Sequence, residues 1–246
     1  MKRKQFFIAL TSGLALLCAI ASTAAAKPSA IPPPPEIDPA NFVRRVTNPF
    51  FPLPPGTKFF YKGTTDGTPT SNETYVTHKT KKILGVTTTV VHDQGFENGV
   101  LVEDTFDWYA QDVDGNVWYF GEDTKELDEH GNVISMEGSW EAGVHGAQPG
   151  IIMKAHPQVG DRYYQEFAPD VAEDQARVLS RDESVCVRYG CFDNVLLTKE
   201  WTQLEPGVAE HKYYAKGVGF ILGVMVKGGH ERTELVRITT EERPEN

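Results

Sequence analysis

Turn signals recur about every 10 to 16 residues in much of this 246-residue chain, and they constrain its fold more than any other feature. The clearest signals are Asn98-Gly99, Asp114-Gly115, His130-Gly131, Gly190 and Pro206-Gly207. The runs between them are rich in Val, Thr, Tyr, Phe and Trp, which favour pleated strands, whereas residues that tolerate positive φ close hairpins. No stretch holds a helical period beyond about ten residues. We therefore predict an all-β fold, an antiparallel meander of about 9 to 11 strands.

The first 26 residues have the three parts of a secretory signal peptide. The chain opens with basic MKRKQ, continues with an apolar run from Phe6 to Ala21, and reaches Ala26 through small residues. We expect cleavage after Ala26 and hence a secreted or periplasmic protein. Leu17 before Cys18, where lipid attachment needs a small residue, argues against a lipoprotein. No later apolar run approaches the length of a membrane span, so we expect none.

A proline-rich stretch follows the signal, with Pro32 to Pro35 in succession. We predict that residues 27–42 form an extended spacer without packed structure. Residues 43–243 show no second low-complexity break and no repeat of fixed period. One β domain is the expectation at that length.

The charge balance excludes one class of partner. The chain carries 24 Lys and Arg against 34 Asp and Glu, a net charge of −10, and loss of the three basic residues of the signal leaves 21 against 34, or −13. Beyond the signal, the densest basic run is only Lys79, Lys81 and Lys82. Nucleic acid needs a clustered basic footprint, so we do not expect a nucleic-acid partner.

Two cysteines remain after the signal, Cys186 and Cys191. They stand on either side of a four-residue turn that ends at Gly190, so opposed Cβ atoms can meet, and an exported protein reaches an oxidising compartment. We predict a structural disulfide that stabilises by roughly 2 kcal/mol, because the loop it closes is short. A redox or metal-binding pair is the alternative, although the spacing is neither CxxC nor part of a zinc pattern.

Parity predicts which way the central side chains face, if the turns between residues 90 and 143 preserve it. One face then collects apolar residues, and we predict it to be the core: Val91, Val100, Val102, Phe106, Trp108, Val117, Tyr119, Ile134, Met136 and Trp140. The opposite face collects His92, Gln94, Glu103, Asp107, Tyr109, Gln111, Trp118, Phe120, Glu122, Glu137 and Glu141. Only a slip by an odd number of residues would break these assignments.

The second face combines five carboxylates with large aromatic rings, which is not the pattern of a plain solvated surface. We predict a ligand-binding site made by Glu103, Asp107, Tyr109, Trp118, Glu122, Glu137 and Glu141. Oxygen ligands suit a hard cation, so Glu103, Asp107 and Glu122 are candidate calcium ligands. A carboxylate pair could instead perform acid and base chemistry on a glycoside. The third alternative is an exposed acidic face, balanced by Lys199 and Lys212.

Other motifs carry little weight. Asp112-Val-Asp-Gly-Asn116 looks like the start of a calcium loop, but Val117 stands where such a loop needs Gly. The glycines between Gly217 and Gly223 lack the βαβ context of a dinucleotide site. No HExxH, Walker or Gly-x-Ser-x-Gly pattern occurs.

Three segments resemble a group of bacterial exported proteins of unknown function. They are NPFFPLPPGT at 48–57, DWYAQDVDGNVWYFGE at 107–122 and YYAKGVGF at 213–220. The resemblance is one of pattern and covers roughly residues 48–220. It implies an exported, mostly antiparallel β protein with a curved sheet or half-barrel, similar to periplasmic lipid-carrier folds. It implies no activity and no catalytic residues.

These patterns favour an exported, non-catalytic binding protein whose acidic and aromatic face receives a cation, a cationic or hydroxylated small ligand, or a partner. The first alternative is an extracellular hydrolase or lyase that uses paired carboxylates. The second is a structural envelope protein, which the proline-rich spacer indicates. Calcium is the one cofactor that the residues suggest.

Overall fold

The computed structural model of the protein describes residues 31–241, and its strands all pair antiparallel in one sheet system. A short 3-10 helix, η1 (Pro39–Asn41), comes first. The strands are β1 (Phe42–Val43), β2 (Thr57–Thr65), β3 (Thr68–Ile83), β4 (Val86–Glu97), β5 (Val100–Asp112), β6 (Val117–Leu127), β7 (Val133–Ser135), β8 (Trp140–Glu141), β9 (Gln148–Met153), β10 (Arg162–Tyr164), β11 (Glu166–Phe167), β12 (Asp174–Val187), β13 (Gly190–Thr202), β14 (Ala209–Ala215), β15 (Gly219–Lys227) and β16 (Glu231–Thr240). The all-β prediction is confirmed.

The strand count differs from the predicted 9 to 11, because five of the 16 strands span only two or three residues. The path through the sheet runs β10-β12-β13-β14-β15-β16-β2-β3-β4-β5-β6-β9-β11. Off this path, β1 pairs with β5, and both β7 and β8 pair with β6. Apart from the step from β16 to β2, most long neighbours are consecutive in the chain, as expected of a meander.

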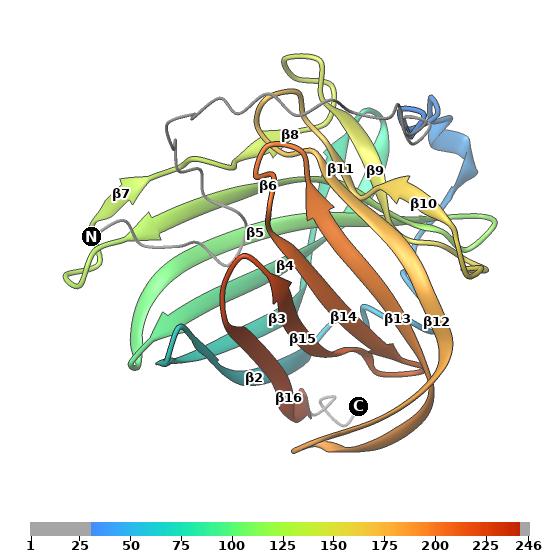
Figure 1. Ribbon diagram of the computed structural model, residues 1–246. Coiled ribbons are helices and arrows are strands. Elements are labelled where there is room, and N and C mark those ends of the chain that lie inside the picture. Colours follow the sequence, from blue (N-terminus) through green and yellow to red (C-terminus); the bar gives the residue numbers. More distant parts are fainter. Residues whose placement is uncertain (1–30, 242–246) are drawn as a thin grey trace, which may run out of the picture.

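The sheet curves until its two ends nearly meet (Figure 1). One short segment links these ends, because β10 pairs with β12 while β11 pairs with β9. Gln165 lies between β10 and β11, and its backbone N–H donates to the Asp174 carbonyl oxygen 2.7 Å away. Gly150 on β9 permits this approach, since a Cβ there would lie 2.2 Å from the Gln165 carbonyl oxygen. The result is a nearly closed wall around an interior space.

Glycine turns close the hairpins where the sequence places them. β4 and β5 meet at Asn98-Gly99, where both residues have positive φ, 51° and 82°. Turns at Asp114-Gly115 and His130-Gly131 follow β5 and β6. Two further hairpins, at Asp66-Gly67 and Leu84-Gly85, use the same positive-φ geometry but were not among the predicted turns.

A β-bulge at Gly95 overturns the predicted facing of β4 against β5. Between Gly95 and Phe96, β4 advances one residue while β5 advances two. This odd slip moves every earlier residue of β4 to the other face. Val91, assigned to the face opposite Asp107, is its direct cross-strand partner.

A second bulge overturns the facing of β6. Asp107 pairs with Glu122, but Tyr109, two residues later, pairs with Tyr119, which is three residues away from Glu122. Glu122 and Tyr119 therefore both face the same side as Asp107, the inside of the sheet. Trp118 faces the outside, so its predicted place beside Asp107 was wrong.

Two apolar clusters follow from this register. The larger lies inside the sheet around Val76, Val195 and Ile221. The smaller lies against the outer side of β5 and β6 and contains Trp108, Trp118, Phe120, Ala142 and Ala147. Three members of the predicted core face are exposed instead: Val100 (42%), Ile134 (55%) and Met136 (53%). Val100 is the first residue of β5, next to the Asn98-Gly99 turn, and the other two lie on and after β7, where β6 has few neighbours.

The N-terminal segment begins to pack earlier than the predicted spacer boundary. Ile37 and Phe42 pack against the smaller cluster, and the Phe42 ring lies 6.1 Å from that of Trp118. The predicted signal peptide and its cleavage site lie outside the described residues. Within residues 31–241, the structure contains no helix long and apolar enough to span a membrane.

Residues 46–56 then turn into the interior. The Asn48 backbone N–H donates to Gln111 Oε1 at 2.8 Å, and the Asn48 side-chain amide donates to the Gly115 carbonyl oxygen at 2.8 Å. Phe50 and Leu53 are buried in the larger cluster. This anchoring holds the intervening segment against the inside of the sheet, where it covers part of the cavity described below.

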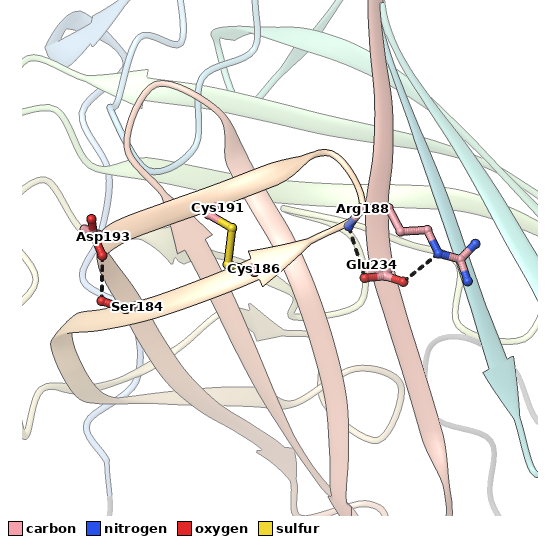
Figure 2. Close-up of a disulfide and its surroundings, with 6 residues drawn as sticks. All are labelled: Ser184, Cys186, Arg188, Cys191, Asp193 and Glu234. Carbon is pink, nitrogen blue, oxygen red and sulfur yellow. Dashed lines mark hydrogen bonds and ion pairs between the residues drawn. A yellow bond between two sulfur atoms is a disulfide. The ribbon is translucent and has the colours of Figure 1, made fainter.

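The long hairpin of β12 and β13 carries the disulfide (Figure 2). Cys186 and Cys191 are register partners with Cα atoms 4.0 Å apart, and the predicted disulfide is confirmed. Beyond it, the hairpin tip contacts β16, because Arg188 Nε lies 3.1 Å from Glu234 Oε1 (Figure 2).

Candidate functional site

A cavity of about 190 Å³ lies inside the curved sheet. An engineered protein cavity of roughly 150 Å³ holds benzene, so this space can take one small ring-sized molecule. Its wall consists of Phe51, Pro52, Leu53, Phe59, Tyr61, Asn72, Thr74, Val91, Asp93, Glu103, Thr105, Asp107, Tyr109, Tyr119, Ile152, Glu166, Glu210, Lys212, Tyr214, Val218, Gly219, Phe220, Glu231 and Thr233.

The cavity wall is both acidic and aromatic. Its carboxylates are Asp93, Glu103, Asp107, Glu166, Glu210 and Glu231. Its rings are Phe51, Phe59, Tyr61, Tyr109, Tyr119, Tyr214 and Phe220. Among the lining residues in the described part of the chain, Lys212 is the only basic side chain.

Strand alternation places three of the carboxylates on neighbouring strands. Asp93 on β4 faces inward two residues beyond Val91, and Val91 pairs with Asp107 on β5. Thr105, the partner of Asp93, and Glu103 complete the inward row of β5. The wall made by β4 and β5 therefore presents Asp93, Glu103 and Asp107 together, because side chains two apart share a face.

Asp93 is held by two neutral donors from β3. The Thr74 hydroxyl donates to Asp93 Oδ2 at 2.6 Å, and the Asn72 side-chain amide donates to Oδ1. Burial raises the pKa of Asp93, and these two hydrogen bonds only partly oppose it.

A second carboxylate group lies deeper, between β5, β6 and β11. Asp107 accepts a hydrogen bond of 2.6 Å from the Tyr119 hydroxyl, and Glu166 accepts one of 3.1 Å from the Trp140 indole N–H. Glu122 lies opposite Asp107 across β5 and β6 and is 6% exposed. Burial raises the pKa of Asp107, Glu122 and Glu166 well above the ordinary range, and repulsion from neighbouring carboxylates adds to it.

Two other lining carboxylates titrate near neutrality. Burial, with the charge of Asp93, raises the pKa of Glu103 to about 7. Burial, with the charge of Glu210, raises the pKa of Glu231 to about 7. At neutral pH each therefore exists partly in the neutral form and responds to any charge that enters the cavity.

Lys212 is engaged on its own side of the cavity. Its Nζ lies 2.9 Å from Glu200 Oε2 and 3.6 Å from Glu210 Oε2. Burial acts to lower the pKa of Lys212, but the charges of Glu200 and Glu210 outweigh it and raise the pKa. The ion pairs of Lys212 are thus made with carboxylates of β13 and β14, and its charge also acts to lower the pKa of Glu166 and Glu231.

The predicted binding residues divide between the two sides of the sheet. Glu103, Asp107 and Tyr109 line the cavity, and Glu122 is buried directly beside Asp107. The prediction that they share a face was correct, but that face is the inside of the sheet.

The other three predicted residues lie elsewhere. Trp118 packs in the outer cluster and donates its indole N–H to Asp112 Oδ2 at 2.8 Å. Glu141 faces outward, 2.7 Å from Lys81 Nζ. Glu137 is exposed in the segment after β7. The bulge after Asp107 is the reason for Trp118, and the pairing of Trp140 with Glu122 is the reason for Glu141, since it leaves Glu141 on the opposite side from Glu122.

Calcium binding stays an untested prediction. In residues 31–241, no three His, Cys, Asp or Glu side chains form a group that could hold a metal ion. The geometry thus lends no support to Glu103, Asp107 and Glu122 as a calcium site.

Sequence reasoning missed several cavity residues. Asp93 shares the face of Asp107 only because of the bulge at Gly95, and the sequence around Gly95 does not reveal that bulge. Glu166 carried no local signal, since it lies on a strand of only two residues. Glu231 carried none either, since it lies on β16, whose partner β2 is far away in the sequence.

No family model and no curated protein sequence matches the chain. Two solved structures are similar at low identity. One is a protein of Bacteroides fragilis NCTC 9343 with a YmcC-like fold, assumed to be exported, with 16% identity, a TM-score of 0.46, and coverage of 78% of this chain and 99% of that one. The other is a protein of Parabacteroides distasonis ATCC 8503 assumed to be a lipoprotein, with 11% identity, a TM-score of 0.43, and coverage of 77% and 98%. At these values the similarity carries no functional argument.

Proposed function

We propose that this protein binds a small organic cation in the cavity inside its curved sheet. The observation that carries the proposal is the meeting of six carboxylates and seven aromatic rings in one space, with Lys212 as the only basic lining residue among those described. Buried carboxylates without a counter-charge are costly to ionise. An ammonium group would supply that charge, and the faces of aromatic rings attract it further.

The aromatic rings of the cavity wall favour an organic cation over a metal ion. Calcium takes six to eight oxygen ligands and gains nothing from a ring face. Tyr109 and Tyr119 stack with ring centroids 4.6 Å apart, and Phe51 meets Tyr109 edge-on at 5.2 Å. These rings stand beside Asp107, so an apolar body and a positive charge can be accommodated together.

The shared direction of the pKa shifts favours binding over catalysis. In carboxylate catalysis, the environment pushes two pKa values apart, so that one group is an acid while the other is ionised. Here burial raises the pKa of Asp93, Glu103, Asp107 and Glu166 alike. The cavity is therefore poised to exchange protons for a cation rather than to divide two roles between two carboxylates.

Cyclohexylamine and cyclohexanol form a matched pair of probes for this proposal. Both have one six-membered ring, and only the first is a cation at neutral pH. With the purified chain from Lys27 onward, we expect calorimetric binding and a rise in melting temperature with cyclohexylamine and neither with cyclohexanol.

The matched variants are Glu103→Gln with Asp107→Asn, against Glu129→Gln on an exposed turn. The double variant should weaken cyclohexylamine binding by about tenfold or more, because it removes two of the charges that the cation contacts. The surface variant should leave binding unchanged. Equal binding of both probes, or an unchanged affinity in the double variant, would show that the cavity does not select cations.

A further inference from the structure

Thr233 on β16 presents a buried hydroxyl group to the cavity. The residue lines the cavity, is 8% exposed, and its Oγ1 has no hydrogen-bond partner within residues 31–241. A buried hydroxyl normally finds a partner, since leaving it without one costs free energy. A ligand that supplies a donor or acceptor at this point would satisfy it.

Glycines on both sides leave the Thr233 hydroxyl uncovered. Its partner on β2 is Gly63, where a Cβ would lie 2.9 Å from Thr233 Oγ1. Its partner on β15 is Gly223, where a Cβ would lie 2.4 Å from Glu210 Oε1. The Glu210 carboxylate therefore lies over Gly223, beside Thr233, and any side chain at either glycine would crowd this polar corner.

A second hydroxyl of the same kind lies across Gly63. Thr70 on β3 pairs with Gly63, is 6% exposed, and its Oγ1 also has no partner among the described residues. Two unpartnered hydroxyls thus flank one glycine on three neighbouring strands.

We infer that the ligand is a hydroxylated ring amine, the chemistry of an amino sugar, and not a cation with a wholly apolar body. The inference rests on the proposed function for the ammonium group. The Thr233 hydroxyl and the Glu210 carboxylate beside it add a requirement for hydroxyl groups on the ligand. Hydroxyl groups both donate and accept hydrogen bonds, so they can pair with threonine and carboxylate oxygens. The ring faces of Tyr61 and Phe220, whose centroids lie 5.4 Å apart in the wall, suit the flat side of such a ring.

The test compares glucosamine, cyclohexylamine and glucose by calorimetry on the chain from Lys27 onward and on Thr233→Val. In the wild type, glucosamine should bind more tightly than cyclohexylamine, and glucose should bind weakly or not at all. Thr233→Val should lower the affinity for glucosamine about five- to tenfold, the value of one lost hydrogen bond, and leave that for cyclohexylamine unchanged. The ratio of wild-type to Thr233→Val affinity is taken for each amine separately, so the difference in basicity between the two amines cancels.

Thr64→Val is the matched control, because Thr64 adjoins Gly63 on β2 and is exposed on the opposite face. It should alter neither affinity. Thr233→Val should also melt at or above the wild-type temperature without ligand, because a methyl group replaces an unsatisfied hydroxyl, so a failure to bind glucosamine is not a failure to fold.

The two proposals fail in different ways. If both amines bind with equal affinity, or Thr233→Val weakens both equally, the hydroxylated-amine inference is wrong and the organic-cation proposal stands. If glucose binds as well as glucosamine, the charge requirement is wrong. If neither amine binds, both proposals are wrong.

Discussion

Asp107 and Glu122 face each other across β5 and β6, and both side chains are buried on the inside of the sheet. A cross-strand pair of like charges is unfavourable, and here the Tyr119 hydroxyl donates to only one of the two carboxylates. The pair therefore holds protons or accepts a positive charge from outside the chain.

The stability of the ligand-free protein should fall as pH rises. A group whose pKa is raised on folding binds more protons in the folded than in the unfolded state, so its favourable contribution is present at low pH and is lost as pH rises through the folded pKa. For Glu103, whose pKa rises from 4.5 to about 7, the loss between pH 4.5 and 8 amounts to about 3 kcal/mol.

Glu103→Gln isolates this effect. Urea unfolding at pH 4.5 and pH 8 should show a smaller loss of stability in the variant than in the wild type, because glutamine does not titrate. The same loss in both proteins would mean that Glu103 is ionised in the folded state at neutral pH.

Binding of an organic cation should release protons. At neutral pH the raised pKa values keep part of the lining carboxylates neutral, and an ammonium group favours their ionised form. Affinity for cyclohexylamine should therefore rise with pH between about 6 and 8, by the linkage of proton and ligand. Phosphate and MOPS differ in ionisation enthalpy, so the binding heats measured in these two buffers should differ in proportion to the number of protons released. Identical heats would contradict the exchange.

The disulfide should stabilise the fold without affecting the cavity. Replacing Cys186 and Cys191 with serine should cost about 2 kcal/mol, as a short closed loop predicts. Because the bond lies in the β12–β13 hairpin, and neither cysteine lines the cavity, cyclohexylamine affinity should persist. Denaturant unfolding and calorimetry measure the two quantities separately, and a loss of binding in folded protein would show that the hairpin shapes the site.

The segment before β2 should be part of the folded domain. Phe42→Ala removes the ring that meets Trp118 and Phe120, and should destabilise the protein by about 2 kcal/mol because the side chain is half-buried. Val43→Ala, at a 37% exposed neighbour, should cost far less. Equal melting temperatures for the two variants would restore the spacer boundary predicted at residue 42.

Export is testable at the N-terminus. The basic, apolar and small-residue parts of residues 1–26 predict cleavage after Ala26. N-terminal sequencing of secreted or periplasmic material should start at or near Lys27. Recovery from the cytoplasm with Met1 intact would contradict it.

The sequence by itself determined the features that depend on a single strand or a single hairpin. The Asn98-Gly99 turn requires positive φ at both residues, and alternation on β5 puts Glu103, Asp107 and Tyr109 on one face, so both were predictable. The Cys186–Cys191 pair was predictable for the same reason, since its geometry depends on one hairpin.

Tertiary structure alone decided which face became the interior. The bulges at Gly95 and after Asp107 each change parity by one residue, and the sequence around them does not reveal an odd slip. The cavity also needs Glu166 and Glu231, which reach it only because β11 closes on β9 and β16 pairs with β2. Such contacts depend on how the whole sheet curves, and that curvature is a sum over many strand pairs that no single segment of the sequence encodes.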